Sequence, residues 1–369
     1  MKKGINIIGY ARAESGLGEA CRSAARVLAS LDIPFCIVNF PHCPSRQEDY
    51  SWQAKEVETP LYDTNLIFIN ADQMLLHKEL LMPYLSGRFN IGVWHWELPI
   101  FPSIWDEAFS MVQEVWAPST FTLHSIAARS TVPVYHVPHS VKLDVDDDVN
   151  RASFQLPENA FLFLTMYETH STIRRKNPVA SIDAFQAAFD KDDETVGLVV
   201  KINGGKEAAH EVEGLHQKIE GYSNIFIIDD ILEKKYVNSL IHVTDSFISL
   251  HRSEGFGLTL AEAMYLEKPV IATNWSANTD FMHKQNSCLV RYSLMVVTGY
   301  VKGLSREQKW AEPDKKDAQF YMRKMVQEQK WAKEIGIKGK NTIDSYLSIK
   351  NVGSIYKKRW DAIRSKSTL

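Results

Sequence analysis

Short apolar runs alternate with amphipathic stretches along most of the chain. A short apolar run indicates a buried strand, and apolar residues recurring every three or four positions indicate a helix. Between the first two runs, Ala20, Ala24, Val27, Leu28 and Leu31 fall on one face of a predicted helix. The runs of the first half are Ile5–Gly9, Phe35–Asn39, Leu66–Asn70, Asn90–Trp94, Glu114–Ala117 and Val134–Val137. This alternation is typical of a parallel sheet covered by helices on both faces.

The alternation stops at an acidic stretch, Lys142–Asn150, which predicts a linker, and then restarts. The second set of runs is Phe161–Met166, Val196–Ile202, Asn224–Ile228, Ser246–Leu250, Pro269–Ala272 and Ser287–Val290. We therefore predict an α/β protein with two doubly wound domains, residues 1–150 and 151–345, that face each other across a cleft. After the last of these runs, Ser305–Lys340 is charged and has a helical pattern.

The most informative chemistry follows the predicted strand Ser246–Leu250. Glu254 lies in the loop at the carboxyl end of this strand, and Glu262 lies about one turn into the next helix. Gly255 and Gly257 allow the backbone to approach a ligand closely, and the N–H groups of a helix start attract an anion. One carboxylate can accept hydrogen bonds from sugar hydroxyls and the other from ribose hydroxyls, with a phosphate between them. This pattern predicts a nucleotide-sugar site.

The same segment resembles the donor-site signature of the retaining family 4 glycosyltransferases (glycosyl transferases group 1), and Lys268–Thr273 and Ser276–Asp280 continue it. The resemblance implies the GT-B fold, with two Rossmann-like domains and a C-terminal helix, residues 346–369, that crosses back to the first domain. It implies that Glu254 fixes the donor sugar and that Glu262 holds the ribose. The resemblance also assigns donor binding to five residues between these glutamates: Gly255, Phe256, Gly257, Leu258 and Thr259.

A second motif, Ser171–Pro178, follows the first strand of the second domain and includes Arg174, Arg175 and Lys176. Three cations at the edge of a sheet suit a pyrophosphate leaving group. The string resembles the Arg-Lys-Asn-Pro variant of a subset of the family, in which Lys176 matches the phosphate-binding lysine. Many members carry an arginine a few residues earlier, which this chain lacks, so either Arg175 or Lys201 would replace it. By position, Ile231 and Leu232 would flank the nucleobase.

The first domain carries the residues that the resemblance assigns to the acceptor side. Gly16 and Gly18 lie in a glycine-rich loop after the first strand, and they would allow the backbone to approach the donor phosphates. The polar-aromatic cluster after the fourth strand supplies His95, where the family often places a histidine, and Glu97, which would orient the acceptor hydroxyl. Trp94 is a further acceptor candidate.

Composition and charge narrow the classes of partner, compartment and cofactor that we expect for this protein. The chain has 369 residues and a net charge of −3, which does not favour nucleic acid. Its four cysteines lack metal-ligand spacing and predict reduced thiols in a cytoplasmic protein. No apolar stretch is long enough to span a bilayer, which leaves open attachment at the inner face of a membrane. There is no Asp-x-Asp pair where a metal-dependent transferase would hold a cation, so we expect neither metal nor cofactor.

The resemblance, together with the absence of an Asp-x-Asp pair, implies a retaining, metal-independent transferase that moves a hexose from a nucleoside-diphosphate sugar to a glycan or lipid-linked acceptor, in bacterial polysaccharide or lipopolysaccharide synthesis. Catalytic roles are expected for Lys176, Glu254 and His95. The base (uridine or guanosine), the hexose and the acceptor stay open. The alternative is a non-catalytic sugar-nucleotide-binding subunit of a glycan-assembly complex. An NAD-dependent oxidoreductase is disfavoured because the chain lacks a Gly-x-Gly-x-x-Gly fingerprint.

Overall fold

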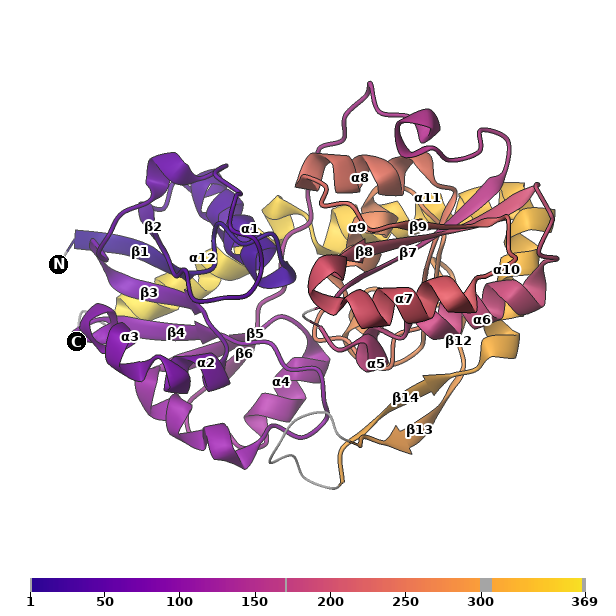
Figure 1. Cartoon of the computed structure of the whole chain (residues 1–369). Helices are drawn as coiled ribbons and strands as arrows, with labels where there is room; N and C mark the ends of the chain where they lie inside the picture. Colours follow the sequence, from indigo (N-terminus) through magenta and orange to yellow (C-terminus); the bar gives the residue numbers. More distant parts are fainter. Residues whose placement is uncertain (1, 170, 299–306, 367–369) are drawn as a thin grey trace. The chain divides into compact units, whose positions relative to one another are not determined.

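The computed structural model describes residues 2–169, 171–298 and 307–366. These residues form two compact units (Figure 1). Unit 1 comprises residues 2–141, 307–308 and 345–366, and unit 2 comprises the described residues of 142–298 together with 309–344.

Unit 1 is built on a six-stranded sheet with the order β2-β1-β3-β4-β5-β6, in which all neighbours are parallel. Its strands are β1 (Lys2–Gly9), β2 (Phe35–Asn39), β3 (Tyr62–Phe68), β4 (Phe89–Val93), β5 (Glu114–Ala117) and β6 (Val134–His136). Its helices include α1 (Gly16–Ser30), α2 (Ala71–Leu76), α3 (Lys78–Leu85) and α4 (Thr120–Ala127), with 3-10 turns at Gln53–Lys55 and Ser103–Met111. The six predicted strands of this half are confirmed.

The predicted C-terminal helix is present as α12 (Ile349–Lys366), which belongs to unit 1 and packs against α1. Its Tyr356 ring meets Trp116 of β5 edge-on, with 4.9 Å between the ring centres. Its Arg359 Nη2 lies 2.5 Å from Oε2 of the buried Glu114. A short stretch near the C-terminus therefore completes the core and the charge balance of the N-terminal sheet.

Unit 2 has a second six-stranded parallel sheet, with the order β12-β11-β10-β7-β8-β9. Its strands are β7 (Phe161–Glu168), β8 (Val196–Asn203), β9 (Ile225–Ile228), β10 (Ser246–Ser249), β11 (Val270–Thr273) and β12 (Cys288–Val290). Its helices include α5 (Ile173–Lys176), α6 (Pro178–Ala188), α7 (Ala209–Lys218), α8 (Lys234–Val243), α9 (Leu258–Tyr265), α10 (Lys315–Gln327) and α11 (Gln329–Tyr346), with 3-10 turns at Arg151–Phe154, Gly205–Ala208 and Ala277–Asp280. The six predicted strands of this half are confirmed, and so is the prediction of two Rossmann-like α/β domains.

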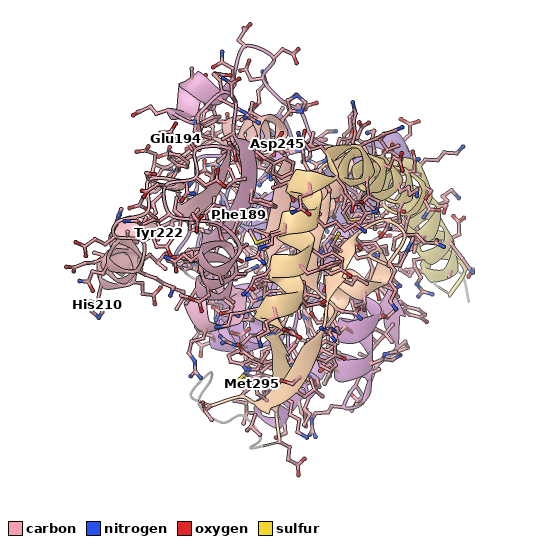
Figure 2. The ribbon with its side chains drawn as sticks, turned by 90° about the vertical axis from the view of Figure 1, so that its right-hand side faces the viewer. Phe189, Glu194, His210, Tyr222, Asp245 and Met295 are labelled. Atoms are coloured by element: carbon pink, nitrogen blue, oxygen red, sulfur yellow. The ribbon has the colours of Figure 1, made fainter. Side chains whose placement is uncertain are left out.

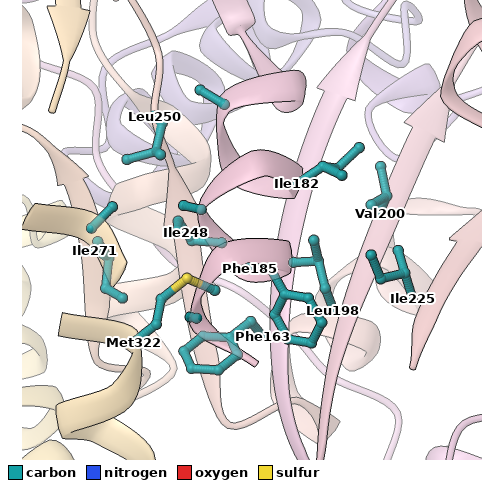
Figure 3. Packing of buried hydrophobic residues seen from close by; sticks show 14 of the residues in the cluster. Phe163, Ile182, Phe185, Leu198, Val200, Ile225, Ile248, Leu250, Ile271 and Met322 are labelled. Carbon is teal, nitrogen blue, oxygen red and sulfur yellow. The ribbon is translucent and has the colours of Figure 1, made fainter. Parts of the chain in front are cut away.

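The strand order of unit 2 is doubly wound: from β7 successive strands are added towards one edge of the sheet, and from β10 towards the other, so the strand order reverses between β7 and β10. Phe163, Phe185, Leu198, Ile248 and Ile271 fill the core around this point (Figure 3). Ligands of such sheets bind outside the carboxyl ends of the strands at the reversal. A ligand site is therefore expected at the loops that follow β7 and β10.

A two-stranded antiparallel sheet was not predicted. It pairs β13 (Tyr292–Val296) with β14 (Lys309–Pro313), and Met295 of β13 is labelled in Figure 2. The prediction of helix from Ser305 to Lys340 is wrong over β14, and helix begins at Lys315; Ser305 and Arg306 lie outside the described residues. Pro313 at the end of β14 is a signal against a continuous helix, and the pairing of the strand with β13 decides its structure.

Candidate active site

The loops after β7 and β10 meet because these strands are neighbours in the sheet, with Ser246 paired to Phe163 and Phe247 to Leu164. The backbone N–H of Arg252 donates to the carbonyl of Arg175, with an N···O distance of 2.8 Å. The two motifs predicted to hold the donor therefore lie side by side, although about eighty residues of chain separate them.

Glu254 lies between the two cations of the first loop. Lys176 Nζ is 2.6 Å from Glu254 Oε1, and Arg175 Nη1 is 3.4 Å from Glu254 Oε2. Arg175 also donates to the carbonyl of Ser253 at 3.0 Å, and both Arg175 and Glu254 are buried. Lys176 keeps 20% of its side chain exposed, so it is the cation of this cluster that solvent and a ligand can reach.

The electrostatics of this cluster favour the charged carboxylate. Burial by itself would raise the pKa of Glu254, but the positive charges of Lys176 and Arg175 outweigh it and lower the pKa to about 2. Glu254 is therefore ionised at neutral pH. It can accept hydrogen bonds, but it has no proton to give as a general acid.

Two further residues hold the loops in place, and the motif analysis assigned no role to either. Asn177 adopts a left-handed backbone conformation (φ 54°) between α5 and α6, and its Nδ2 donates to the carbonyl of Leu250 at 2.9 Å. Ser276 Oγ accepts from the backbone N–H of Glu254 at 2.8 Å. Asparagine tolerates the left-handed region and can bond to nearby backbone, and this is the sequence signal that could have marked Asn177.

The start of α9 faces the same edge of the sheet. Gly257 caps the helix with a φ of +86°, a conformation that favours glycine, and Leu258 is the first helical residue. Phe256 is buried and packs against Phe281, with 6.0 Å between the ring centres. Gly255 is also buried, whereas Leu258 and Thr259 are half-buried. The helix start thus has its backbone near the loop of Glu254, while Phe256 anchors that loop to the core.

Glu262 lies on α9 with only 2% of its side chain exposed, and Lys234 Nζ is 2.5 Å from its Oε1. Lys234 is the first residue of α8, directly after the loop that carries Ile231 and Leu232. Ile231 is 48% exposed and Leu232 is half-buried. The predicted ribose carboxylate and the predicted base loop are therefore connected through an ion pair that sequence reasoning missed.

Lys201, near the end of β8, is almost fully buried. Its Nζ donates to the carbonyls of Ile202 at 2.5 Å and of Asp230 at 2.8 Å. Burial lowers its pKa to about 8, although the nearby Asp229 and Asp230 act in the opposite direction. In this position Lys201 braces the loops after β8 and β9, whereas Arg175 and Lys176 contact Glu254.

In unit 1, His95 follows β4 and contacts a second histidine. The Nε2 atoms of His95 and His139 are 2.7 Å apart, so one ring donates and the other accepts, and the backbone N–H of His95 donates to Asn70 Oδ1 at 2.8 Å. Burial lowers the pKa of His95 to about 4, and burial followed by the neighbouring His95 lowers the pKa of His139 well below its ordinary value. Both rings are therefore neutral at pH 7, and a single proton lies between them.

This pair makes folding sensitive to acid. In the unfolded chain the two histidines bind protons near their ordinary pKa of 6.5, whereas in the folded protein they resist protonation. Their contribution to stability is therefore fully present above pH 6.5, and it is lost as the pH falls from there towards the folded pKa.

The other unit 1 candidates differ in accessibility. Trp94 has no exposed surface and packs between Phe101 and Phe109, so its predicted contact with an acceptor has no support in this packing; Glu97 is half-buried. Gly16 is exposed, and a Cβ there would meet no atom within 4 Å. A Cβ at Gly18 would lie 1.9 Å from the carbonyl oxygen of Ala13. Gly18 therefore allows a close approach within its own loop.

Comparison with known proteins gives a family match over part of the chain and structural neighbours over nearly all of it. Residues 146–291 match the model of the family Glycosyl transferases group 1. The sucrose-phosphate synthase of Thermosynechococcus elongatus is a structural neighbour at a TM-score of 0.72 and 12% identity, over 99% of this chain and 100% of that one. Two others are HepE of Anabaena in complex with UDP and glucose (TM-score 0.68, 11% identity, 98% and 100%) and a glycosyltransferase of Rickettsia africae (0.68, 12%, 98% and 99%).

The protein has the GT-B fold. No curated protein sequence gives a significant match to the chain. The family match falls on unit 2, where it includes the motifs of Lys176 and Glu254, and the likeness to the GT-B structures extends over both units.

Within the described part of this GT-B chain, no three His, Cys, Asp or Glu side chains are grouped so that they could hold a metal ion. Among the described helices, none combines the length and the apolar character that crossing a membrane requires.

Proposed function

We propose that this GT-B protein is a retaining, metal-independent glycosyltransferase that moves a hexose from a nucleoside-diphosphate sugar to a glycan or lipid-linked acceptor in bacterial polysaccharide or lipopolysaccharide synthesis. The observation that carries the proposal is the contact of Lys176 with Glu254 at the strand reversal of unit 2, inside the segment that matches the family. The structural neighbours crystallised with UDP and glucose or with UDP-glucose support a nucleotide sugar as the ligand.

On the donor side, each charged group has a part in the proposal. Negative charge builds on the diphosphate as the bond between the sugar carbon and the phosphate oxygen breaks. Lys176 and the N-terminus of α9 stabilise this charge, and fixed charges of this kind are usually the largest catalytic term. Glu254, ionised at neutral pH, accepts hydrogen bonds from the hydroxyls of the transferred sugar. Glu262 holds the ribose.

The family arginine that the chain lacks is replaced, in this proposal, by Arg175. Arg175 lies against Glu254 and Ser253 at the site, whereas Lys201 donates to two backbone carbonyls of neighbouring loops. Because Arg175 is buried, it acts by adding positive charge behind Lys176, and Lys176 makes the direct contact with the phosphate.

On the acceptor side, His95 and Glu97 are the candidates that the proposal retains. A neutral His95 can accept or donate one hydrogen bond without placing a positive charge next to the acceptor. In the proposed one-face reaction, the acceptor oxygen attacks the sugar carbon on the side from which the diphosphate leaves. The departing phosphate oxygen takes the acceptor proton, so the anomeric configuration is retained.

The test measures nucleoside-diphosphate release from a panel of UDP- and GDP-hexoses, with and without glycan acceptors, in the presence of EDTA. Lys176→Ala and Glu254→Ala should each lower transfer at least about a hundredfold, by analogy with losing one electrostatic donor. Lys235→Ala is the control, because Lys235 is 52% exposed and its ion pair is with Asp146 at 3.2 Å, not with a residue of the proposed site. Near-normal rates in both site variants would end the assignment, and product NMR would test retention.

The alternative, a non-catalytic sugar-nucleotide-binding subunit, has a distinct outcome in the same experiment. Such a subunit would bind the nucleotide sugar in a calorimetric titration, and Lys176→Ala would weaken that binding. It would release no diphosphate with any donor and acceptor in the panel.

A further inference from the structure

Lys234 belongs to none of the recognised motifs, and yet it makes one of the shortest ion pairs of unit 2. Its Nζ lies 2.5 Å from Glu262 Oε1, with 32% of the Lys234 side chain exposed and 2% of the Glu262 side chain. The lysine reaches from the start of α8 to the middle of α9, and it is separated from Leu232 by one residue.

Local helix preferences do not explain this lysine. The first turn of a helix favours acidic residues, because the helix dipole is positive there, and α8 instead begins with Lys234 and Lys235. What the position of Lys234 does provide is a counter-charge for the carboxylate of Glu262. A carboxylate buried to this degree needs a charged partner and a fixed geometry, since leaving it unpaired carries a large desolvation penalty.

The pair also connects two parts of the nucleotide site that recognise different groups. Glu262 is the carboxylate assigned to the ribose, and the exposed Ile231 lies on the loop that precedes Lys234. A carboxylate recognises the two hydroxyls of a ribose only when it stays ionised and keeps a single orientation. A cation that contacts one of its oxygens maintains both conditions.

We propose that Lys234 is a positioning residue for ribose recognition, which makes the site select ribonucleotides over 2′-deoxyribonucleotides. The inference rests on the proposed function, because it assigns a nucleoside diphosphate to this site. Lys234 acts through Glu262 in this proposal, and it makes no contact of its own with the phosphates.

The experiment measures dissociation constants for UDP and 2′-deoxy-UDP, and for GDP and 2′-deoxy-GDP, by calorimetry. The ratio within each pair cancels the contribution of the base. The wild type should bind the ribonucleotide of its preferred pair about tenfold more tightly or better, since a hydrogen bond to a charged group is lost with the 2′-hydroxyl. Lys234→Met should reduce this ratio to below about threefold, and Glu262→Gln should reduce it similarly.

Three controls separate positioning from other roles. Lys234→Arg should restore the ratio, because it keeps a cation beside Glu262. Lys235→Met, next in the chain and paired with Asp146 at 3.2 Å, should leave the ratio unchanged. Binding of inorganic pyrophosphate should be the same in the wild type and in Lys234→Met, and thermal melting confirms that each variant is folded.

Two results would overturn the role of Lys234 and leave the proposed function standing. One is a preference for the ribonucleotide in Lys234→Met that equals the wild-type preference. The other is a loss of pyrophosphate binding in that variant, which would make Lys234 a phosphate ligand. Should Lys234→Met fail to fold, the ratio in Lys234→Arg decides, since a ratio that collapses with the cation retained contradicts positioning by charge. A wild-type protein that binds no nucleoside diphosphate refutes the proposed function itself.

Discussion

Replacing Glu254 by glutamine should tighten nucleotide binding while it abolishes transfer. In the free protein, Lys176 is already engaged by Glu254 at 2.6 Å. A diphosphate that takes Lys176 must therefore compete with that carboxylate. Glutamine keeps the size of the side chain and removes its charge, so Lys176 and Arg175 then attract the diphosphate without a competing anion.

The size of the effect follows from the pKa of Glu254. Its fall from 4.5 to about 2 corresponds to roughly 3 kcal/mol of preference for the ionised carboxylate in the presence of the two cations. If about half of this is given up when the diphosphate takes Lys176, the competition costs about 1.4 kcal/mol, which is about tenfold in Kd. Glu254→Gln should therefore bind UDP or GDP, whichever the wild type prefers, about tenfold more tightly.

The assay is calorimetric titration of the wild type and Glu254→Gln with UDP and with GDP, together with thermal melting in the presence and absence of the nucleotide. The free variant should melt below the wild type, because Arg175 is left without its carboxylate partner, and the nucleotide should raise its melting temperature by more. Asp183→Asn is the control, since Asp183 on α6 pairs with Lys218 and Lys315 instead of the site cations. Equal or weaker nucleotide binding by Glu254→Gln would refute the reasoning.

The remaining predictions concern stability, measured by urea unfolding. Gly18→Ala should lower the free energy of unfolding by about 2 kcal/mol or more, because the added Cβ overlaps a backbone oxygen. Gly16→Ala should change it by less than about 0.5 kcal/mol, because a Cβ there meets no atom. Equal effects of the two substitutions would contradict the packing argument. Arg359→Met should lower the free energy of unfolding by about 3 kcal/mol, because it leaves the buried carboxylate of Glu114 without its cation. Lys357→Met breaks an exposed pair on the same helix and should lower it by less than about 1 kcal/mol. A small loss for both variants would show that the buried pair adds little to stability. Going from pH 7 to pH 5 should cost the wild type about 2 kcal/mol more than it costs His95→Gln; parallel pH profiles of the two proteins would exclude the histidine pair as the cause.

Apolar periodicity predicted the strands because it is a local property of the chain. A strand buried on both faces of a parallel sheet must be apolar along its length, so its position can be found without knowing its neighbours. For the same reason the loops of Lys176 and Glu254 could be placed at the carboxyl ends of their strands. The β13–β14 pair escaped prediction because β13 is mostly exposed and β14 mixes charged with buried residues, so that only their pairing shows that they are strands.

Apolar periodicity did not predict the directions in which the side chains of the site point. Trp94 and His95 are adjacent, and packing among aromatic rings turned Trp94 into the core, while His95 was placed against a histidine 44 residues away. Lys201 lies near the end of β8, and its amino group donates to two backbone carbonyls. Burial makes such choices compulsory, because each buried polar atom must find a partner, and the partners come from distant segments.

The sequence by itself determined where the strands of the two parallel sheets lie, which residues follow their carboxyl ends, and which chemistry those residues can perform. Only the tertiary structure decided that β7 lies beside β10, that Lys176 therefore contacts Glu254, and that Lys234 contacts Glu262. The physical reason is that strand identity depends on near neighbours in the chain, whereas strand order and ion pairing depend on contacts between segments that are far apart in sequence, and these form only when the whole core is assembled.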